Sequence, residues 1–310
     1  MYDIIIVGGG TAGLSAAIYG VRAGRKVLIL EAKSYGGQII NSPEVENYPG
    51  IRKISGMEFA KGLYEQATGL GAEFRQGQVI RVEEQENCRV VVVSGVDKSG
   101  SDREEQKYET KTVILATGAR NRPLGVAREQ ELTGAGVSYC ATCDGMFFRG
   151  RQVAVAGGGS TALEDAAFLS NYCEKVYLIH RRNQFRGEER LVENLRQKEN
   201  VEFVLDTVVT GLLGETILEG IRIQDVATKE ERELAVSGLF VAVGQMPDNK
   251  DFAGLVALDE KGYIQAAEDC RTDTPGIFVA GDCRTKDVRQ LATAAADGAV
   301  AALAACEYIG

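Results

Sequence analysis

The chain has 310 residues, of which 45% are hydrophobic and 25% charged, so it is long enough for about two folded domains and too apolar for intrinsic disorder. Its formal net charge of −9 excludes the broad positive surface that non-specific nucleic-acid binding requires. The start, Met1-Tyr2-Asp3, lacks the basic segment of a signal peptide, and no apolar stretch approaches the ~18 residues of a membrane span. We therefore expect a soluble chain with neither a nucleic-acid nor a membrane partner.

Seven cysteines are too few for a disulfide-stapled scaffold, and only Cys140 and Cys143 lie close together in sequence. In a chain without an export signal, a lone C-x-x-C pair indicates redox chemistry before structural bridging. The chain contains one histidine, His180, which limits the choice of groups that can carry a proton.

The sequence contains one motif twice, because residues 3–33 and 152–182 superpose without a gap at an offset of 149. In each copy a short β-branched run predicts a buried parallel strand, glycines follow, and an apolar pattern predicts a helix and then a second strand. The predicted strand, helix and second strand are 4–7, 12–23 and 26–30 in the first copy and 153–156, 161–172 and 175–179 in the second. This is a βαβ unit that occurs twice.

The glycines of each copy have separate tasks in dinucleotide binding. The first permits the tight turn, the second lets a pyrophosphate approach the backbone, and the third small residue lets helix and strand pack closely. The phosphates then meet the free N–H groups and the positive dipole end of the helix. The residues concerned are Gly8, Gly10, Thr11, Ala12 and Gly13, and then Gly157, Gly159, Ser160, Thr161 and Ala162. Plain tight turns are the alternative, but they would have to occur twice at identical spacing.

The end of the second strand distinguishes the two sites. Glu31 stands where a carboxylate accepts the ribose hydroxyls of a nucleotide, whereas the equivalent position in the second copy is His180. Arg181, Arg182 and Arg186 follow it, and guanidinium groups bind a 2′-phosphate that a carboxylate would repel. The first site therefore suits FAD or NAD and the second NADP, with His180 as a minor cofactor contact. A solvated basic helix start is the alternative interpretation of the arginines.

Two further strand ends belong to the first site. Predicted strands at 112–116 and 277–280 are followed by Thr117-Gly118 and Gly281-Asp282. Ligands of open α/β sheets gather at the carboxyl ends of strands, so these residues should face the cofactor. An alanine-rich helix begins near Arg289 and runs towards Tyr308, and its N-terminus can stabilise negative charge on a flavin.

The order of these elements predicts an α/β protein with two Rossmann-like dinucleotide-binding domains, in which the FAD domain is split by the inserted NADPH domain. Turn residues near Pro123 and Pro247 mark the two crossings. We expect residues 1–118 and 245–310 to form the FAD-binding domain and residues 119–244 the NADPH-binding domain. Two such domains in one short chain imply a flavoenzyme.

The motifs together resemble the low-molecular-weight, bacterial-type NADPH-dependent thioredoxin reductases over nearly the whole chain. They are GGGTAG (8–13), GGQ (36–38), EVENYPG (44–50), ATGA (116–119), CATCDG (140–145), GGGSTA (157–162), HRRNQFR (180–186), GD (281–282) and RQLATAAADG (289–298). Thr11, Ser160 and Met146 replace a common proline, asparagine and aromatic residue, and the last of these bears on partner docking. The resemblance adds Gly36, Gly37, Gln38, Asn47, Arg289, Gln290, Leu291 and Ala292 to the expected FAD contacts.

The C-x-x-C pair could in principle be half of a zinc site, but a zinc ribbon needs two such pairs and only one is present, so we expect no metal. The resemblance implies a redox-active disulfide between Cys140 and Cys143, with Cys143 facing the flavin and Cys140 attacking the partner disulfide. Asp144 is the nearest candidate acid, because the only histidine belongs to the nucleotide loop. A structural role for Asp144 in the turn before Gly145 is the alternative. Cys283 adjoins Asp282, and we expect it to be a buried structural thiol.

The implied enzyme is a cytoplasmic homodimer that passes electrons from NADPH through FAD and the dithiol to a thioredoxin-like protein. The alternative enzyme is a related flavoprotein reductase of another redoxin or peroxiredoxin system. Relatives driven by ferredoxin tend to lack the basic nucleotide loop, and a ferredoxin–NADP reductase of similar fold would lack the C-x-x-C pair. From another class, an NADP-sensing binding module would have an unreactive dithiol and slow turnover.

Overall fold

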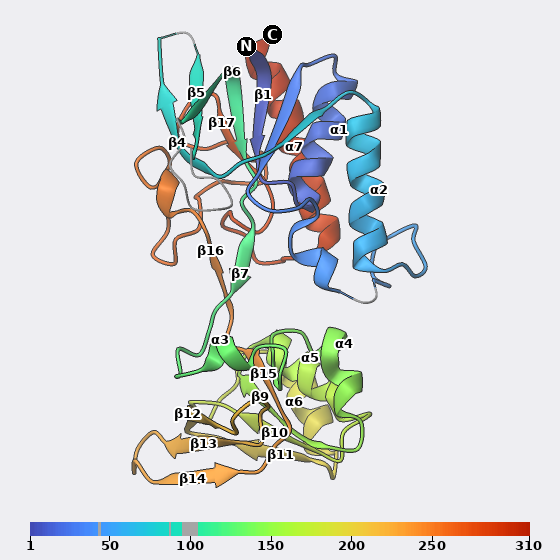
Figure 1. The fold of residues 1–310 in the computed structure, drawn as a ribbon, viewed down its shortest axis with the longest axis vertical. Helices are drawn as coiled ribbons and strands as arrows, with labels where there is room; N and C mark the ends of the chain where they lie inside the picture. Colours follow the sequence, from blue (N-terminus) through green and yellow to red (C-terminus); the bar gives the residue numbers. More distant parts are fainter. Residues whose placement is uncertain (43–44, 87, 95–104) are drawn as a thin grey trace. The chain divides into compact units, whose positions relative to one another are not determined.

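The structure is a computed structural model that describes residues 1–42, 45–86, 88–94 and 105–310, without the side chains of Asn41 and Cys143. It contains two compact units (Figure 1). Unit 1 consists of Met1–Arg120 and Met246–Gly310, and unit 2 of Asn121–Gln245. These divisions lie two residues and one residue beyond the predicted domain boundaries at 118/119 and 244/245.

Unit 1 is built on a mixed sheet with the strand order β3-β2-β1-β6-β5-β4, in which β17 also pairs with β6. The strands are β1 Tyr2–Val7, β2 Val27–Glu31, β3 Glu73–Gln76, β4 Val79–Glu84, β5 Arg89–Val93, β6 Gln106–Leu115 and β17 Ile277–Val279. The parallel strands of this sheet are β1, β2, β3, β6 and β17. Strand β5 pairs antiparallel with both β6 and β4. The helices are α1 Thr11–Arg22, α2 Gly56–Gly69 and α7 Leu291–Ile309, with the 3-10 turns η1 Gly37–Asn41 and η3 Lys250–Phe252.

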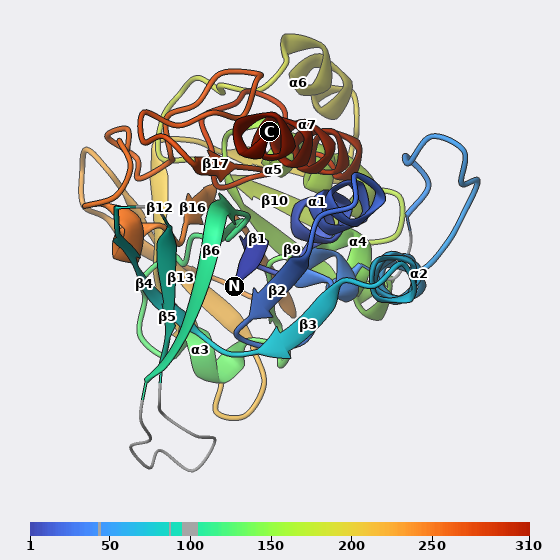
Figure 2. The ribbon, with the colours of Figure 1, turned by 90° about the horizontal axis from the view of Figure 1, so that it is seen from above.

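The alternation of apolar residues along β1 gives unit 1 a core on each face of its sheet. Ile4 and Ile6 face α1, α2 and α7, which lie on one side of the sheet (Figure 2). Ile5 and Val7 face the other side, where they meet β4, β5 and apolar residues between 252 and 283. Parallel strands buried on both faces require such continuous β-branched runs.

Helix α7 is a correction to the sequence analysis. It is long and apolar enough by length and composition to cross a membrane, so the expectation that no segment has this property was wrong. The reason is its many alanines, which give a moderately apolar helix without any run of large apolar residues. In the structure this helix packs against α1 and places Ala294, Ala301 and Ala305 in the core of unit 1.

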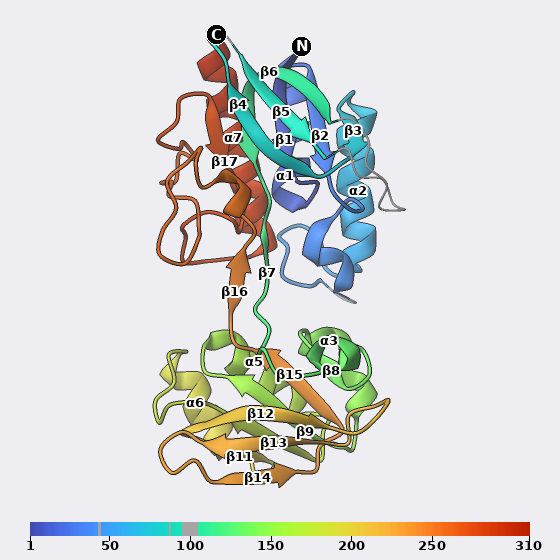
Figure 3. The same cartoon turned by 60° about the vertical axis from the view of Figure 1, so that its left-hand side comes forward.

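Unit 2 has a parallel sheet with the order β11-β10-β9-β15-β8 and a separate antiparallel sheet with the order β12-β13-β14. The strands are β8 Val137–Ser138, β9 Gln152–Gly157, β10 Lys175–Ile179, β11 Val201–Val204, β12 Thr207–Leu213, β13 Gly220–Asp225, β14 Glu231–Leu234 and β15 Gly238–Ala242. The helical elements are α3 Glu129–Leu132, α4 Ala141–Asp144, η2 Gly145–Phe148, α5 Ser160–Leu169 and α6 Glu189–Arg196. The antiparallel sheet covers one face of the parallel sheet, and α5 and α6 cover the other (Figure 3).

The two chain segments that join the units, β7 Ala119–Asn121 and β16 Gln245–Pro247, pair with each other. The predicted repeat is confirmed down to its strand register, because Ile4 pairs with Val27 and Val153 pairs with Val176, each at the offset of 149. The predicted helix over 161–172 ends three residues early, since the N–H groups of Ser170 to Cys173 close the last turn. The fold class is the expected one.

A buried ion cluster ties α7 to the loop after β17. Asp297 is 5% exposed, and its carboxylate accepts hydrogen bonds of 2.9 Å from Nε and Nη2 of Arg284, from Nζ of Lys286 and from the Gly281 N–H. Burial by itself would raise the pKa of Asp297, but the hydrogen bonds from Arg284 and Lys286 outweigh it and hold the pKa below its ordinary value. The carboxylate therefore stabilises the fold at neutral pH, and this contribution is lost as the pH falls through the lowered pKa.

We expect Asp297→Asn to destabilise unit 1 by about 3–5 kcal/mol at pH 7, because the amide removes the buried carboxylate that pairs with both Arg284 and Lys286 and leaves Arg284 with the exposed Glu268. Urea unfolding followed by circular dichroism measures the effect. Glu307→Gln is the matched control, since Glu307 lies on the same helix and its side chain is 77% exposed. Equal stabilities of the Asp297 and Glu307 variants would contradict this account of the cluster.

Candidate active site

The predicted first-site residues converge at the carboxyl ends of three parallel strands of unit 1. Val7 pairs with Leu115 and Leu115 pairs with Val279, so β1, β6 and β17 end at the same level. The residues that follow these strands, Gly8, Thr117 and Gly281, therefore lie together although up to 273 positions separate them (281 − 8). This is the edge at which open α/β sheets bind ligands.

The first glycine turn is shaped by close backbone contacts. Gly8 has φ +111°, and a Cβ there would lie 2.2 Å from the carbonyl oxygen of Ala116. A Cβ at Gly13 would lie 1.9 Å from the carbonyl oxygen of Gly8, so α1 can approach the strand only with glycine at this position. Gly10 caps α1 without a side-chain hydrogen bond, and the first turn of the helix is left to bind an anion.

The Glu31 carboxylate stabilises the glycine turn by two hydrogen bonds and keeps acceptor positions for a ligand. Its Oε2 accepts a 2.7 Å hydrogen bond from the Gly9 N–H, and its Oε1 accepts one of 2.9 Å from the Lys33 N–H. A carboxylate has about four acceptor positions, so two remain for ribose hydroxyls. Gly36 joins the same loop, because its N–H donates to the carbonyl oxygen of Gly9 at 2.7 Å. Gly37 lies beside Gly10, and Gln38 is in η1.

Asp282 carries the observation that best fits a bound cofactor. Its Oδ1 is buried and has no hydrogen-bond partner among the described residues. Burial raises the pKa of Asp282, while the charges of Lys286 and Arg289 act in the opposite direction. A buried acceptor without a donor is costly, and a hydroxyl group of a ribityl chain would supply the missing donor. The residues present therefore fit FAD.

Other predicted contacts are held by residues that the sequence analysis missed. Thr117 Oγ1 donates to Asn249 Oδ1 at 2.8 Å, and the Asn249 amide in turn donates to the carbonyl oxygen of Cys283 at 2.9 Å. Asn249 is 1% exposed and gave no signal in the sequence, because its partner is 132 positions away. Gly118 has φ +69°, and among the described residues no atom beyond its chain neighbours lies within 4 Å of where its Cβ would be.

The N-terminus of α7 contributes to the same predicted site. The Asn47 amide donates to Gln290 Oε1 at 3.1 Å. Gln290 is the N-cap of α7, where its N–H donates to Thr293 Oγ1 at 3.1 Å, and Leu291 and Ala292 begin the helix. The Arg289 guanidinium lies over the ring of Tyr263, 4.2 Å from its centre, and its Nε donates to the carbonyl oxygen of Asp282. All the expected FAD contacts thus belong to unit 1.

The second glycine turn repeats this geometry in unit 2. A Cβ at Gly157 would lie 2.3 Å from the carbonyl oxygen of Ala242 and 2.7 Å from the Cβ of Ala162. Gly159 is the N-cap of α5, where Ser160 and Thr161 form the first turn, and it makes no side-chain hydrogen bond. Within the part of the chain that the structure describes, no atom beyond its chain neighbours lies within 4 Å of where its Cβ would be. This open cap suits a phosphate group.

The basic loop after β10 folds over this turn. The Arg186 N–H donates to the carbonyl oxygen of Gly158 at 2.7 Å, while the side chains of Arg181, Arg182 and Arg186 are exposed. Exposed guanidinium groups beside the glycine turn remain available to a 2′-phosphate.

His180 lies inside this loop. Its ring is stacked on Phe185, its Nε2 donates to the carbonyl oxygen of Gln184 at 3.1 Å, and a Cβ at Gly158 would lie 2.1 Å from the ring. Burial and the charges of Arg186, Arg181 and Arg182 lower the pKa of His180. The neutral ring therefore braces the basic loop against the glycine turn, and its contact with a cofactor stays a prediction.

The dithiol segment also belongs to unit 2. Cys140 is half-buried and disulfide-bonded, and it immediately precedes α4, which packs against α5. The Cys143 side chain lies outside the described part of the structure, so the predicted Cys140–Cys143 bond stays a prediction. Cys88, Cys173, Cys270, Cys283 and Cys306 are free thiols. Burial raises the pKa of the Cys283 thiol, as expected of a structural cysteine.

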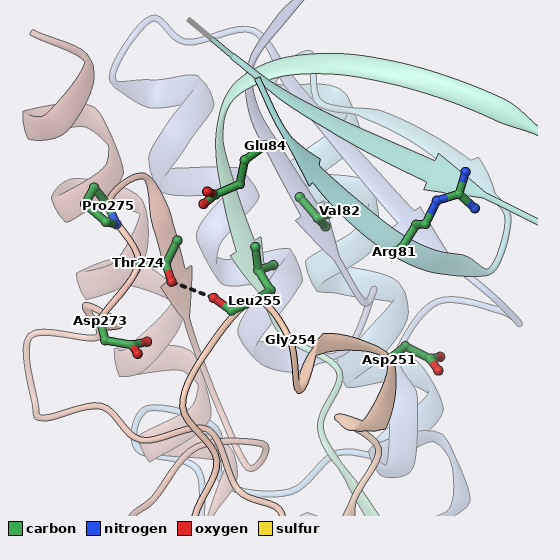
Figure 4. Close-up of a pocket in the computed structure, with 9 residues that line it drawn as sticks. All are labelled: Arg81, Val82, Glu84, Asp251, Gly254, Leu255, Asp273, Thr274 and Pro275. Carbon is green, nitrogen blue, oxygen red and sulfur yellow. Dashed lines mark hydrogen bonds between the residues drawn. The ribbon is translucent and has the colours of Figure 1, made fainter. Parts of the chain in front are cut away.

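A surface pocket of unit 1 lies elsewhere. Figure 4 shows its lining, which comes from β4, from η3 and the loop after it, and from residues 273–275 just before β17. It contains none of the predicted site residues. Among the described ranges no group of three or more His, Cys, Asp or Glu side chains is placed to hold a metal ion.

Comparisons with known proteins agree with this geometry. Residues 2–299 match the family model of the pyridine nucleotide-disulphide oxidoreductases. The thioredoxin reductase of Listeria innocua is 38% identical over 310 residues, covering 100% of this chain and 94% of the relative. The bifunctional thioredoxin reductase/thioredoxin of Mycobacterium leprae is 39% identical over 100% of this chain and 66% of its own length. A crystal structure of Lactococcus lactis thioredoxin reductase has a TM-score of 0.84 at 37% identity and covers 100% of this chain and 99% of the other.

The chain belongs to the pyridine nucleotide-disulphide oxidoreductase family. Within that family it is similar over its full length to bacterial-type thioredoxin reductases. It is a flavoprotein oxidoreductase whose cofactors are FAD and NADPH.

Changing Arg181 and Arg182 together to Ala should lower kcat/KM for NADPH at least tenfold and leave that for NADH nearly unchanged. Each charge-assisted hydrogen bond to the 2′-phosphate is worth about 1.5–3 kcal/mol, and NADH lacks this phosphate. Steady-state rates with both nucleotides measure the preference. Arg232→Ala, an exposed arginine on β14, is the control. An unchanged preference in the double variant would place the 2′-phosphate elsewhere.

Proposed function

We propose that the protein is an NADPH-dependent thioredoxin-disulfide reductase, in which Cys140 and Cys143 form the redox-active pair. The observation that carries the proposal is the disulfide-bonded Cys140 in a C-x-x-C segment of the same unit as the second nucleotide turn. The likeness to thioredoxin reductases over the full chain supports it. No observation favours the reductase of another redoxin or peroxiredoxin system.

The residues of the first site would hold FAD, and those of the second would hold NADPH. Gly8 to Gly13 would take the FAD pyrophosphate, Glu31 the ribose hydroxyls and Asp282 the ribityl chain. The second turn, from Gly157 to Ala162, would take the NADPH pyrophosphate. The chemistry that FAD would supply when bound is two-electron transfer from NADPH to the Cys140–Cys143 disulfide, which becomes the dithiol.

The reduced dithiol would then act by exchange. The Cys140 thiolate attacks the partner disulfide, a bond forms between the two sulfurs, and the released partner sulfur takes a proton from Asp144. Asp144 then accepts the proton of the Cys143 thiol, whose sulfur attacks Cys140 and restores the Cys140–Cys143 disulfide. The second partner sulfur leaves with its electron pair and takes a proton from solvent.

The surface beside the dithiol supports a protein partner. Phe147 is 78% exposed and Met146 49% exposed, and both follow Asp144 in η2. Neighbouring large apolar side chains exposed beside a reactive cysteine are typical of a docking surface. The Mycobacterium leprae relative is a bifunctional thioredoxin reductase/thioredoxin, which supports thioredoxin as the partner here.

Cys140→Ser should abolish thioredoxin reduction at saturating NADPH and leave flavin reduction by NADPH intact, because the exchange needs a sulfur nucleophile and the hydride step does not. Thioredoxin reduction is followed by NADPH consumption, and flavin reduction by its absorbance in anaerobic rapid mixing. Cys88→Ser, at a half-exposed free thiol of unit 1, is the control. Full thioredoxin reductase activity in the Cys140 variant would refute the proposed relay.

We also propose the cytoplasmic homodimer that the resemblance implies. Exposed apolar side chains on α7 and α1 support it, among them Leu303 at 53%, Tyr308 and Tyr19. These two helices pack against each other in unit 1.

Leu303→Asp should weaken dimerisation at least tenfold, since a charge in an apolar interface is costly to desolvate. Sedimentation equilibrium measures the dissociation constant. Ile217→Asp, an exposed apolar residue of unit 2, should leave the dimer intact. A wild-type monomer at micromolar concentration would refute the homodimer.

A further inference from the structure

Ser138 is a buried serine immediately before the dithiol segment. It is the last residue of β8 and pairs with Phe240 of β15, so the parallel sheet of unit 2 fixes its backbone. The residue is only 5% exposed. A hydroxyl buried at a strand end requires partners, and its partners here are both on the dithiol segment.

The Ser138 hydroxyl contacts both ends of this segment. Its Oγ donates a hydrogen bond to Asp144 Oδ2 at 2.6 Å and accepts one from the Cys140 N–H at 3.0 Å. The carbonyl oxygen of Cys140 lies 3.3 Å from the same Oγ, but a hydroxyl has one proton, and the shorter bond to a carboxylate is the stronger. The Asp144 N–H donates to the carbonyl oxygen of Cys140 at 3.1 Å, which completes a closed loop of hydrogen bonds.

Ser138 thus links the side chain of Asp144, the proposed acid, to the backbone of the reactive Cys140, and the parallel sheet of unit 2 holds Ser138 in place. Asp144 ends the single turn of α4, and a helix of this length cannot hold a side chain in place by itself. The Ser138 hydrogen bond fixes one carboxylate oxygen, and Oδ1 remains for the proton that the exchange moves.

The geometry points to Ser138 as the positioning residue that holds Asp144 for proton transfer during thiol–disulfide exchange. This inference rests on the proposed function of the dithiol. In the step concerned, a bond forms between Cys140 Sγ and a partner sulfur, and the partner disulfide breaks. The released sulfur carries the electron pair and takes the proton from Asp144. Ser138 remains bonded to Asp144 throughout and exchanges no atoms.

The test is a double-mutant cycle on the holoenzyme with Ser138→Ala, Asp144→Ala and both together. Pre-reduced enzyme is mixed with oxidised thioredoxin, and with the small disulfide 5,5′-dithiobis(2-nitrobenzoate) as a second acceptor. We expect Ser138→Ala to slow exchange at least tenfold through kcat, with KM for thioredoxin within twofold of wild type. Flavin reduction by NADPH should be unchanged. In the Asp144→Ala background the serine change should have no further effect, because its role acts through Asp144.

Two further variants separate positioning from a merely structural role. Ser138→Thr keeps the hydroxyl and should restore most of the rate, which also covers the case in which the alanine variant fails to fold. Ser170→Ala is the matched control, because Ser170 is a buried serine of unit 2 whose hydroxyl donates only to the carbonyl oxygen of Ala167.

Three outcomes would overturn the inference: a wild-type exchange rate in Ser138→Ala, no rescue by Ser138→Thr, or equal slowing by Ser138→Ala with and without Asp144. If the wild-type protein reduces the small disulfide but not thioredoxin, the proposed partner fails, and the cycle with the small disulfide still decides the role of Ser138.

Discussion

In both units, close backbone contacts at the carboxyl ends of the parallel strands restrict which residue can occupy the turn between strand and helix. A Cβ at Gly8 would collide with the carbonyl group of Ala116, and a Cβ at Gly157 would collide with that of Ala242. Since a carbonyl group at the end of a paired strand cannot move aside, only glycine allows strand, turn and helix to meet there. Each of these turns leads into a helix whose N-cap makes no side-chain hydrogen bond, and each proposed nucleotide site includes this helix start.

Unit 1 depends on two distant parts of the chain folding together. β17 pairs with β6, and α7 packs against α1, so the segments before residue 121 and after residue 245 share their cores. Neither segment could bury its apolar faces alone. An inserted unit is compatible with this fold because the chain leaves and returns through the paired strands β7 and β16.

Asp282, in the loop after β17, and Asp297, in α7, differ in whether the protein itself satisfies their carboxylate oxygens. Asp297 is fully paired with two cations and a backbone N–H, which makes it a structural residue. Asp282 keeps one buried oxygen without a partner among the described residues, which is tolerable only where a ligand supplies the donor. Asp144 lies between these cases, because Ser138 donates to one of its oxygens and the other is the one to which we assign the proposed proton transfer.

The sequence by itself determined the features that depend on local pattern. The repeat at an offset of 149 predicted both βαβ units, whose first and second strands pair in equivalent register. The different residues at Glu31 and His180 separated the two predicted nucleotide sites. Only the tertiary structure revealed the antiparallel layers β4–β5 and β12–β14, the support of Thr117 by Asn249 and the pairing of Asp297 with Arg284. Such contacts join residues that are far apart in the sequence and belong to no motif, so no periodicity or spacing predicts them. They form because burial forces each polar group to find a partner, and the folded packing decides which partner is near.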